Sequence, residues 1–194
     1  VVIDNRPGAA SNVAMAEVAR APADGYTILV APTTIESANP FLYKASANPA
    51  TDLMAVAGLC RFQLHMVVRN GFPAKDVAEL VAYAKKNPGK LNYGMVGRGS
   101  AQEILALELG KATGIQMTGV PYKGGAEMMG DLVAGRVHFY VSPTGPMIPM
   151  ARSGKLKLLA VSSAERLAAM PETPTLSEKG LPFVRFGWLG VCAG

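Results

Sequence analysis

Glycine and small polar residues gather in three loops, each of which leads into an expected helix. The loops are Gly97-Arg98-Gly99, Tyr122-Lys123-Gly124-Gly125 and Ser142-Pro143-Thr144-Gly145. Free backbone N–H groups and the positive end of the helix dipole bind anions at such positions. Three loops of this kind in succession predict an anion site, whereas any one of them alone is equally well explained as a tight turn.

The glycines do not follow a nucleotide-binding pattern. A phosphate-binding P-loop places Lys directly before its Ser or Thr, but here Gly99 precedes Ser100. The dinucleotide fingerprint needs a third glycine where Gln102 stands. The pattern therefore argues against phosphate chemistry.

Residues that could act as a base, a nucleophile or a metal ligand are scarce. The sequence has no Gly-x-Ser-x-Gly nucleophile elbow. Its two histidines, His65 and His138, lie in strand-like runs, where a structural histidine is the simpler interpretation. Cys60 and Cys192 lie in apolar strands and are typical of small core residues. We expect binding rather than catalysis, with no catalytic residue, no metal and no cofactor.

Composition limits the class of protein further. The chain has 194 residues, of which 49% are hydrophobic and 17% charged, which suits one globular domain or two small lobes. No run of 18 apolar residues is present. The net charge is +5, but the Lys and Arg residues are scattered, so no nucleic-acid partner is expected.

Strands and helices alternate around the three loops. A capping box at Asp76–Glu79 predicts the start of a helix that ends near Lys86. Three βα units follow, with strands over 91–95, 115–120 and 137–141 and helices over 100–111, 126–134 and 146–152, and a last strand covers 156–161. This alternation predicts an α/β fold with mainly parallel sheets flanked by helices.

The first part of the chain is less regular. We expect strands at Val1–Asp4 and Tyr26–Ala31, a helix at Ser11–Arg20 and a long extended run at Val56–Val68. The sequence begins with neither a Met nor a signal peptide, so we expect a fragment of a longer protein.

An ordered set of short motifs resembles the Bug family, the periplasmic solute receptors of tripartite tricarboxylate transporters. The motifs cover nearly the whole chain: Asp4-Asn5-Arg6-Pro7-Gly8-Ala9, Pro22-Ala23-Asp24-Gly25-Tyr26-Thr27, Asn39-Pro40-Phe41-Leu42-Tyr43, Pro88-Gly89-Lys90-Leu91-Asn92-Tyr93, Gly97-Arg98-Gly99-Ser100, Val120-Pro121-Tyr122-Lys123-Gly124, Pro171-Glu172-Thr173-Pro174-Thr175, Glu178 and Gly180-Leu181-Pro182. The resemblance implies a two-lobed periplasmic binding protein of type II.

The resemblance also implies the division of the chain. Residues 1–60 would form part of lobe one, 61–185 lobe two with its three βα units, and 186–194 a strand returning to lobe one. The first lobe would be incomplete in this fragment. Segments Val56–Val68 and Phe183–Ala193 would cross between the lobes, and each carries one cysteine, for which we favour free thiols over a disulfide.

The site residues that the resemblance implies come from both lobes. We expect the ligand to be bound by residues that match the family's loops, with Ser142 and Thr144 added from the third small-residue loop: Thr33, Thr34, Gly97, Arg98, Gly99, Ser100, Ala101, Tyr122, Lys123, Gly124, Ser142 and Thr144. The family commonly has Asn at the position of Arg98, Thr where Ser100 or Ala101 stands, and often Asp in the loop of Ser142 and Thr144. The missing Asp and the added Arg98 favour a dicarboxylate or aromatic carboxylate without an amine.

The function that the resemblance implies is transport. The protein would capture a small organic carboxylate between its lobes in the periplasm and deliver it to the membrane subunits of the transporter, as a monomer at full length. Two alternatives stay open: a ligand-sensing effector domain, which would follow a helix-turn-helix, and an α/β enzyme, which would need a base near the cleft.

Overall fold

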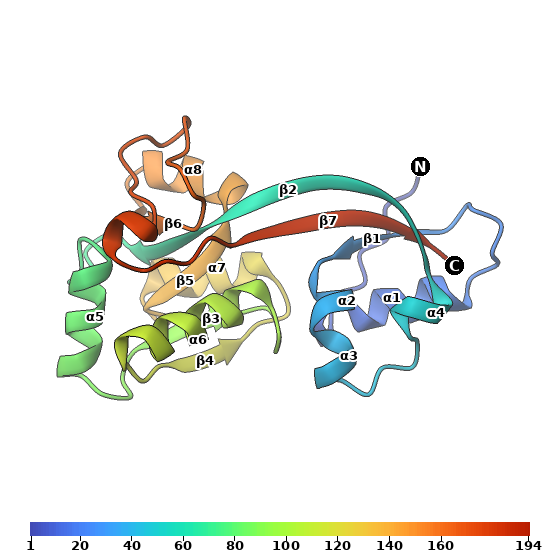
Figure 1. Ribbon diagram of the computed structural model, residues 1–194, viewed down its shortest axis with the longest axis horizontal. Helices are drawn as coiled ribbons and strands as arrows, with labels where there is room; N and C mark the ends of the chain where they lie inside the picture. The colour runs from blue at the N-terminus through green and yellow to red at the C-terminus, as the bar shows by residue number, and fades with distance from the viewer. The chain divides into compact units, whose positions relative to one another are not determined.

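The computed structural model describes all 194 residues and divides the chain into two units (Figure 1). Unit 1 consists of Val1–Arg61, Gly97–Ser100 and Gly187–Gly194, and unit 2 consists of Phe62–Val96 and Ala101–Phe186. The chain passes from one unit to the other within strand β2 (Met54–Arg69) and returns at strand β7 (Phe186–Ala193). Residues 97–100, which we expected in lobe two, group with unit 1 instead.

Unit 1 consists of several short helices and a small sheet that includes an antiparallel pair of strands. Its elements are η1 (Ala9–Ser11), α1 (Asn12–Arg20), β1 (Ile28–Pro32), α2 (Thr34–Ser37), α3 (Asn39–Leu42), α4 (Pro49–Asp52), the first half of β2 and most of β7. Strand β1 pairs antiparallel with β7, which also neighbours β2. Leu29 and Ala31 are buried against Met15 and Val18 of α1, whereas Ile28 and Val30 alternate with them and are exposed.

The expected strand at Val1–Asp4 is not formed. These residues have no regular secondary structure, and Val1, Val2 and Ile3 are exposed. An isolated extended segment leaves its backbone groups unpaired and its apolar side chains in water, so β propensity alone does not make it a strand.

The sheet of unit 2 has the strand order β4-β3-β5-β2-β6. Strands β3 (Asn92–Met95), β4 (Thr118–Pro121), β5 (Phe139–Pro143) and β6 (Leu156–Val161) all run in one direction, because β3 is parallel to β4 and β5, and β2 is antiparallel to both β5 and β6. The predicted α/β class with a mostly parallel sheet is therefore confirmed.

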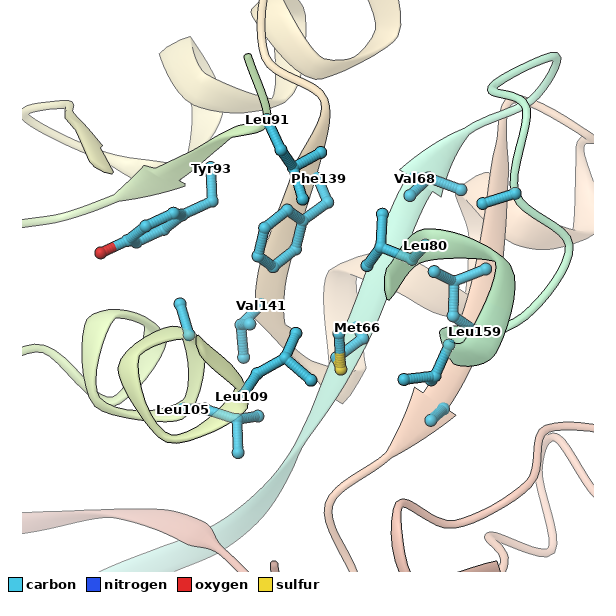
Figure 2. Packing of buried hydrophobic residues seen from close by; sticks show 14 of the residues in the cluster. Met66, Val68, Leu80, Leu91, Tyr93, Leu105, Leu109, Phe139, Val141 and Leu159 are labelled. Atoms are coloured by element: carbon cyan, nitrogen blue, oxygen red, sulfur yellow. The ribbon is translucent and has the colours of Figure 1, made fainter. Parts of the chain in front are cut away.

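Helices cover both faces of this sheet. Helices α5 (Val77–Lys86) and α6 (Ala101–Thr113) share one apolar cluster with Met66, Val68 and Phe139, which Figure 2 shows together with Leu80 and Leu109. Helices α7 (Gly125–Ala134) and α8 (Thr144–Arg152) share a second cluster with Val67 and Tyr140. Successive strand residues point to opposite faces, so β2 and β5 supply both clusters.

Local signals placed α5 correctly. The Asp76 carboxylate accepts a hydrogen bond from the backbone N–H of Glu79 at 2.9 Å, and the Glu79 carboxylate accepts one from the N–H of Lys75 at 2.7 Å. The N–H of Glu79 also lowers the pKa of the Asp76 carboxyl group. The N-cap bond of the predicted capping box is thus formed, whereas the return bond of Glu79 goes to the residue before the N-cap.

The end of β5 differs from the expectation. Ser142 and Pro143, expected in a loop, are the last residues of the strand, and α8 starts directly at Thr144. The long strand β2 supplies ladder partners for the two extra residues, since His65 pairs with Ser142 and Leu64 with Pro143. Where a strand ends depends on how far its partner strand continues the ladder, and the strand's own sequence does not show the position of that partner.

Between β6 and β7 the chain makes an irregular excursion that includes the short helix η2 (Ser177–Lys179). Cys60 is exposed and Cys192 is buried, and both are free thiols. None of the helices combines the length and the apolar character that crossing a membrane requires.

Candidate functional site

The loop Gly97–Ser100 packs closely within unit 1. Gly97 and Gly99 have φ values of 135° and 77°, which side-chain-bearing residues rarely adopt. A Cβ atom on Gly99 would lie 2.5 Å from Leu42 and 2.8 Å from Ala38. The Tyr43 hydroxyl donates to the carbonyl oxygen of Arg98 at 3.1 Å. Glycine is therefore required here by backbone conformation as well as by the close approach of neighbours.

The side chains of this loop differ in exposure. Arg98 is exposed, whereas Ser100 is only 4% exposed. The N–H of Ser100 donates to the carbonyl oxygen of Gly97 at 3.3 Å, so this amide closes the turn. Ala101, the next expected site residue, is the first residue of α6 in unit 2.

Thr33 is tied to the returning strand β7. Its N–H and its hydroxyl both donate to the carbonyl oxygen of Trp188, at 3.2 and 3.1 Å, and the hydroxyl oxygen accepts from the N–H of Trp188 at 2.9 Å. Thr34 follows as the first residue of α2. Thr33 therefore has a structural role in unit 1, because it joins the start of α2 to β7.

The Tyr122-Lys123-Gly124 loop presents its residues unequally. The Tyr122 hydroxyl donates to Asp131 of α7 at 2.7 Å, and Asp131 forms an ion pair with Arg136 at 2.6 Å. Burial and the bond to Asp131 raise the pKa of Tyr122 to about 12. Lys123 is exposed, and Gly124 precedes α7 without a side-chain cap. Because the N-cap residue Gly124 has no side chain, no side chain of that residue caps the N–H groups in the first turn of α7.

The end of β5 brings together residues that the sequence analysis singled out and others that it missed. The Thr144 hydroxyl donates to the carbonyl oxygen of Gln63 at 3.2 Å and lies 3.4 Å from Nδ1 of His65. Tyr140 forms side-chain hydrogen bonds with Ser142 and with Gln102 of α6. From the sequence we did not expect His65, Tyr140 or Gln102 in a site. A polar residue within an apolar strand pattern is a signal that could have indicated His65 and Tyr140, but not Gln102, which lies in a helix.

The two histidines occupy different surroundings. His138 directly precedes β5, and its Nδ1 accepts a hydrogen bond from the backbone nitrogen of Asn92 at 3.2 Å. Burial lowers the pKa of both histidines, that of His65 to about 4. No three His, Cys, Asp or Glu side chains lie close enough to hold a metal ion. What the described groups offer are hydrogen bonds and helix N-termini, which suit the binding of an anion.

The fold is that of a periplasmic binding protein, as comparison with solved structures shows. The adipate-bound Rpa4515 of R. palustris superposes with a TM-score of 0.95 at 36% identity, over 99% of this chain and 65% of that one. MatC from Rhodopseudomonas palustris, with bound malate, gives 0.88 and 31% over 96% and 64%. The periplasmic binding protein BugD gives 0.92 and 32% over 99% and 64%.

The chain belongs to the tripartite tricarboxylate transporter family receptors, whose sequence model matches residues 1–194. A UPF0065 protein from Cupriavidus necator is 33% identical over 193 residues, which is all of this chain and 58% of that protein. The chain thus spans little more than half the length of this relative. The family resemblance drawn from the ordered motifs is confirmed.

Proposed function

We propose that this protein binds a small organic carboxylate in the periplasm and delivers it to the membrane subunits of a tripartite tricarboxylate transporter, without catalysing a reaction. The proposal rests on one observation: at one edge of the unit 2 sheet, each of the parallel strands β3, β4 and β5 is followed by a helix, α6, α7 or α8. Ligands of open α/β sheets bind at this edge, and helix N-termini there favour anions.

The comparisons support a carboxylate as the anion. Two structurally similar proteins hold adipate and malate, both of which are dicarboxylates. The chain itself adds a net charge of +5, which favours the approach of an anion. Closure of the two lobes on the ligand is part of the proposal, because a ligand that contacts both lobes stabilises the closed state.

The residues that we propose for binding are the ones that the sequence analysis named. The backbone N–H groups of Gly99 and Ala101 and the Ser100 hydroxyl would hold one carboxylate, whereas the N–H of Ser100 is already bonded to the carbonyl oxygen of Gly97. Arg98, which is exposed, would form a bidentate pair with a second carboxylate. The loop of Tyr122, Lys123 and Gly124, with Ser142, Thr144, Thr33 and Thr34, would complete the site.

The proposal is tested by calorimetric titration with mono- and dicarboxylates. At least one carboxylate should bind, and Arg98→Asn should weaken dicarboxylate binding about tenfold while changing monocarboxylate binding little. Lys90→Asn, an equal change of charge at another exposed position, is the control and should leave both unchanged. Equal losses for both classes would remove Arg98 from the site, and a protein that binds no carboxylate would refute the function.

The role of Ser100 needs a separate measurement, because Ser100 directly precedes α6 and its loss also affects the helix. Ser100→Ala should weaken carboxylate binding by about tenfold. Urea unfolding of the same variant measures the cost to the fold, which is about 1 kcal/mol for a lost helix cap. Unchanged affinity in a folded Ser100→Ala protein would show that Ser100 does not contact the ligand.

A further inference from the structure

Five polar side chains from four elements meet inside unit 2 at the end of β5. We call them the β5 polar cluster: His65 of β2, Gln102 of α6, Tyr140 and Ser142 of β5, and Thr144 of α8. Tyr140 hydrogen-bonds Gln102 and Ser142, and His65 stands opposite Ser142 in the strand register. His65, Tyr140 and Ser142 are at most 3% exposed, and Gln102 is 8% exposed.

The surroundings of the cluster are otherwise apolar. Tyr140 belongs to the same buried group as Val67, Met128, Leu132 and Met147. Burying polar groups among such residues is unfavourable unless each of them is hydrogen-bonded. Tyr140, Gln102, Ser142 and Thr144 meet this condition through their hydrogen bonds, so the member of the cluster that packing leaves unexplained is His65.

One atom of the cluster has no hydrogen-bond partner. This atom is Nε2 of His65, whose side chain is fully buried. The Thr144 hydroxyl has a single proton, which it donates to the carbonyl oxygen of Gln63. Its oxygen is therefore the acceptor for an N–H at Nδ1 of His65, 3.4 Å away.

This bond network assigns the tautomer of His65. A neutral imidazole carries one N–H, so a proton at Nδ1 leaves Nε2 as a bare acceptor. Burial lowers the pKa of His65 to about 4, which keeps the ring neutral at physiological pH. The unpartnered atom thus requires a donor.

The donor must be uncharged. The β5 polar cluster contains no carboxylate, so an ammonium group there would be buried without a counter-charge. Burial also raises the pKa of Tyr140, which therefore stays a neutral phenol. A ligand hydroxyl satisfies these conditions, because it donates one hydrogen bond and can accept others from groups such as the Gln102 amide.

We propose that the β5 polar cluster is the specificity subsite of this protein, in which Nε2 of His65 accepts a hydrogen bond from a hydroxyl group of the bound acid, so that the ligand is a hydroxycarboxylate. The inference rests on the proposed function, since it selects among carboxylates. Ser142 and Thr144 belong both to the cluster and to the proposed carboxylate site, and they lie where β5 ends and α8 begins.

Paired ligands that differ by one hydroxyl group test the inference. Malate is titrated against succinate, and 3-hydroxyadipate against adipate, into the whole chain and into His65→Leu. We expect the wild-type protein to bind at least one hydroxy acid about tenfold more tightly than its partner, and His65→Leu to lose that preference. His138→Leu, which changes the other histidine in the same unit, should keep it.

The stability of the same variant separates recognition from packing. His65→Leu should unfold at a higher urea concentration than the wild type, because it removes an unpartnered buried nitrogen. A histidine that only supports the fold would give the opposite shift. Lower stability of His65→Leu together with an unchanged hydroxyl preference would overturn the inference.

The tautomer gives a test that needs no ligand. A long-range proton–nitrogen spectrum of the ¹⁵N-labelled chain should show Nδ1 of His65 protonated and Nε2 unprotonated. A proton on Nε2 would overturn the inference. If carboxylates bind without any preference for the hydroxyl, the subsite is refuted and the proposed function stands, whereas if none binds, both fail.

Discussion

His65 lies in β2, between β5 and β6 in the unit 2 sheet, opposite the end of β5. It pairs with Ser142 on one side and Val161 on the other, and its side chain is fully buried. Charging the ring there would cost desolvation free energy, so burial lowers its pKa from 6.5 to about 4. The residue therefore affects stability as well as the recognition proposed above.

The pH dependence of folding should reveal this. Between pH 6.5 and about 4 the unfolded chain binds a proton at His65 and the folded protein does not, so the free energy of unfolding falls as the pH falls through this window. Each unit of pKa difference corresponds to about 1.4 kcal/mol. Urea unfolding at about pH 7 and about pH 5 should show a smaller loss for His65→Leu than for the wild type. An equal loss in both proteins would contradict the prediction.

Tyr122 illustrates a second effect at the scale of one residue. Its hydroxyl donates to Asp131, whose carboxyl pKa is lowered chiefly by the bond from Arg136 and then by that from Tyr122. Tyr122→Phe should raise the pKa of Asp131 toward its usual value, as a carbon-detected pH titration can measure. Tyr26→Phe, at an exposed tyrosine, should have no effect. An unchanged Asp131 pKa in Tyr122→Phe would show that the bond does not persist in solution.

At the scale of elements, the contact of α7 with β3 depends on a strand glycine. Gly94 is buried in β3, and a Cβ atom there would lie 2.2 Å from Sδ and 2.5 Å from Cγ of Met128. Met128 is itself fully buried, so its side chain has little room to move. The absence of a side chain at Gly94 therefore lets the helix approach the sheet.

Gly94→Ala should lower the free energy of unfolding by about 1–3 kcal/mol, as overpacking of a core does. Combining it with Met128→Ala should cost less than the sum of the two single changes, because the second removes the clash. Gly130→Ala on the same helix meets no atom within 4 Å and should instead stabilise by about 0.5–1 kcal/mol. Chemical denaturation of the four variants checks these values, and strict additivity would disprove the clash.

At the scale of the whole molecule, the two units differ in the size of their cores. The apolar cluster of unit 1 contains seven buried residues, whereas the two clusters of unit 2 contain 21 and six. In addition, β2 is exposed over its first eight residues in unit 1 and buried from Leu64 to Val68 in unit 2. Local stability follows buried apolar contact, so unit 1 should open more easily.

Hydrogen exchange followed by mass spectrometry measures this directly. Amides of β1 and α1 should exchange faster than those of β3, β5 and α6, and the difference should persist across the pH range in which the fold is stable. Leu29→Ala should speed exchange in unit 1 and leave Phe139 and Val141 protected. Equal protection of both units in the unmodified protein would refute the prediction.

The sequence by itself determined the features that depend on neighbours along the chain. The start of α5 at Val77 follows from Asp76 and Glu79, which lie within one helical turn of each other. The alternation of apolar strands with amphipathic helices determined the α/β class, and the ordered motifs determined the family. The loops that precede α6 and α7 were likewise visible, because glycine marks them.

Only the tertiary structure decided the features that depend on distant pairing. Strand β5 ends at Pro143 because β2 continues its ladder, and Thr33 is held by Trp188, 155 residues away. The same pairing of His65 with Ser142 gathers the β5 polar cluster from positions between 65 and 144. Each of these residues looks ordinary in its local sequence, since a strand's own pattern shows which face a side chain takes but not which strand will lie beside it.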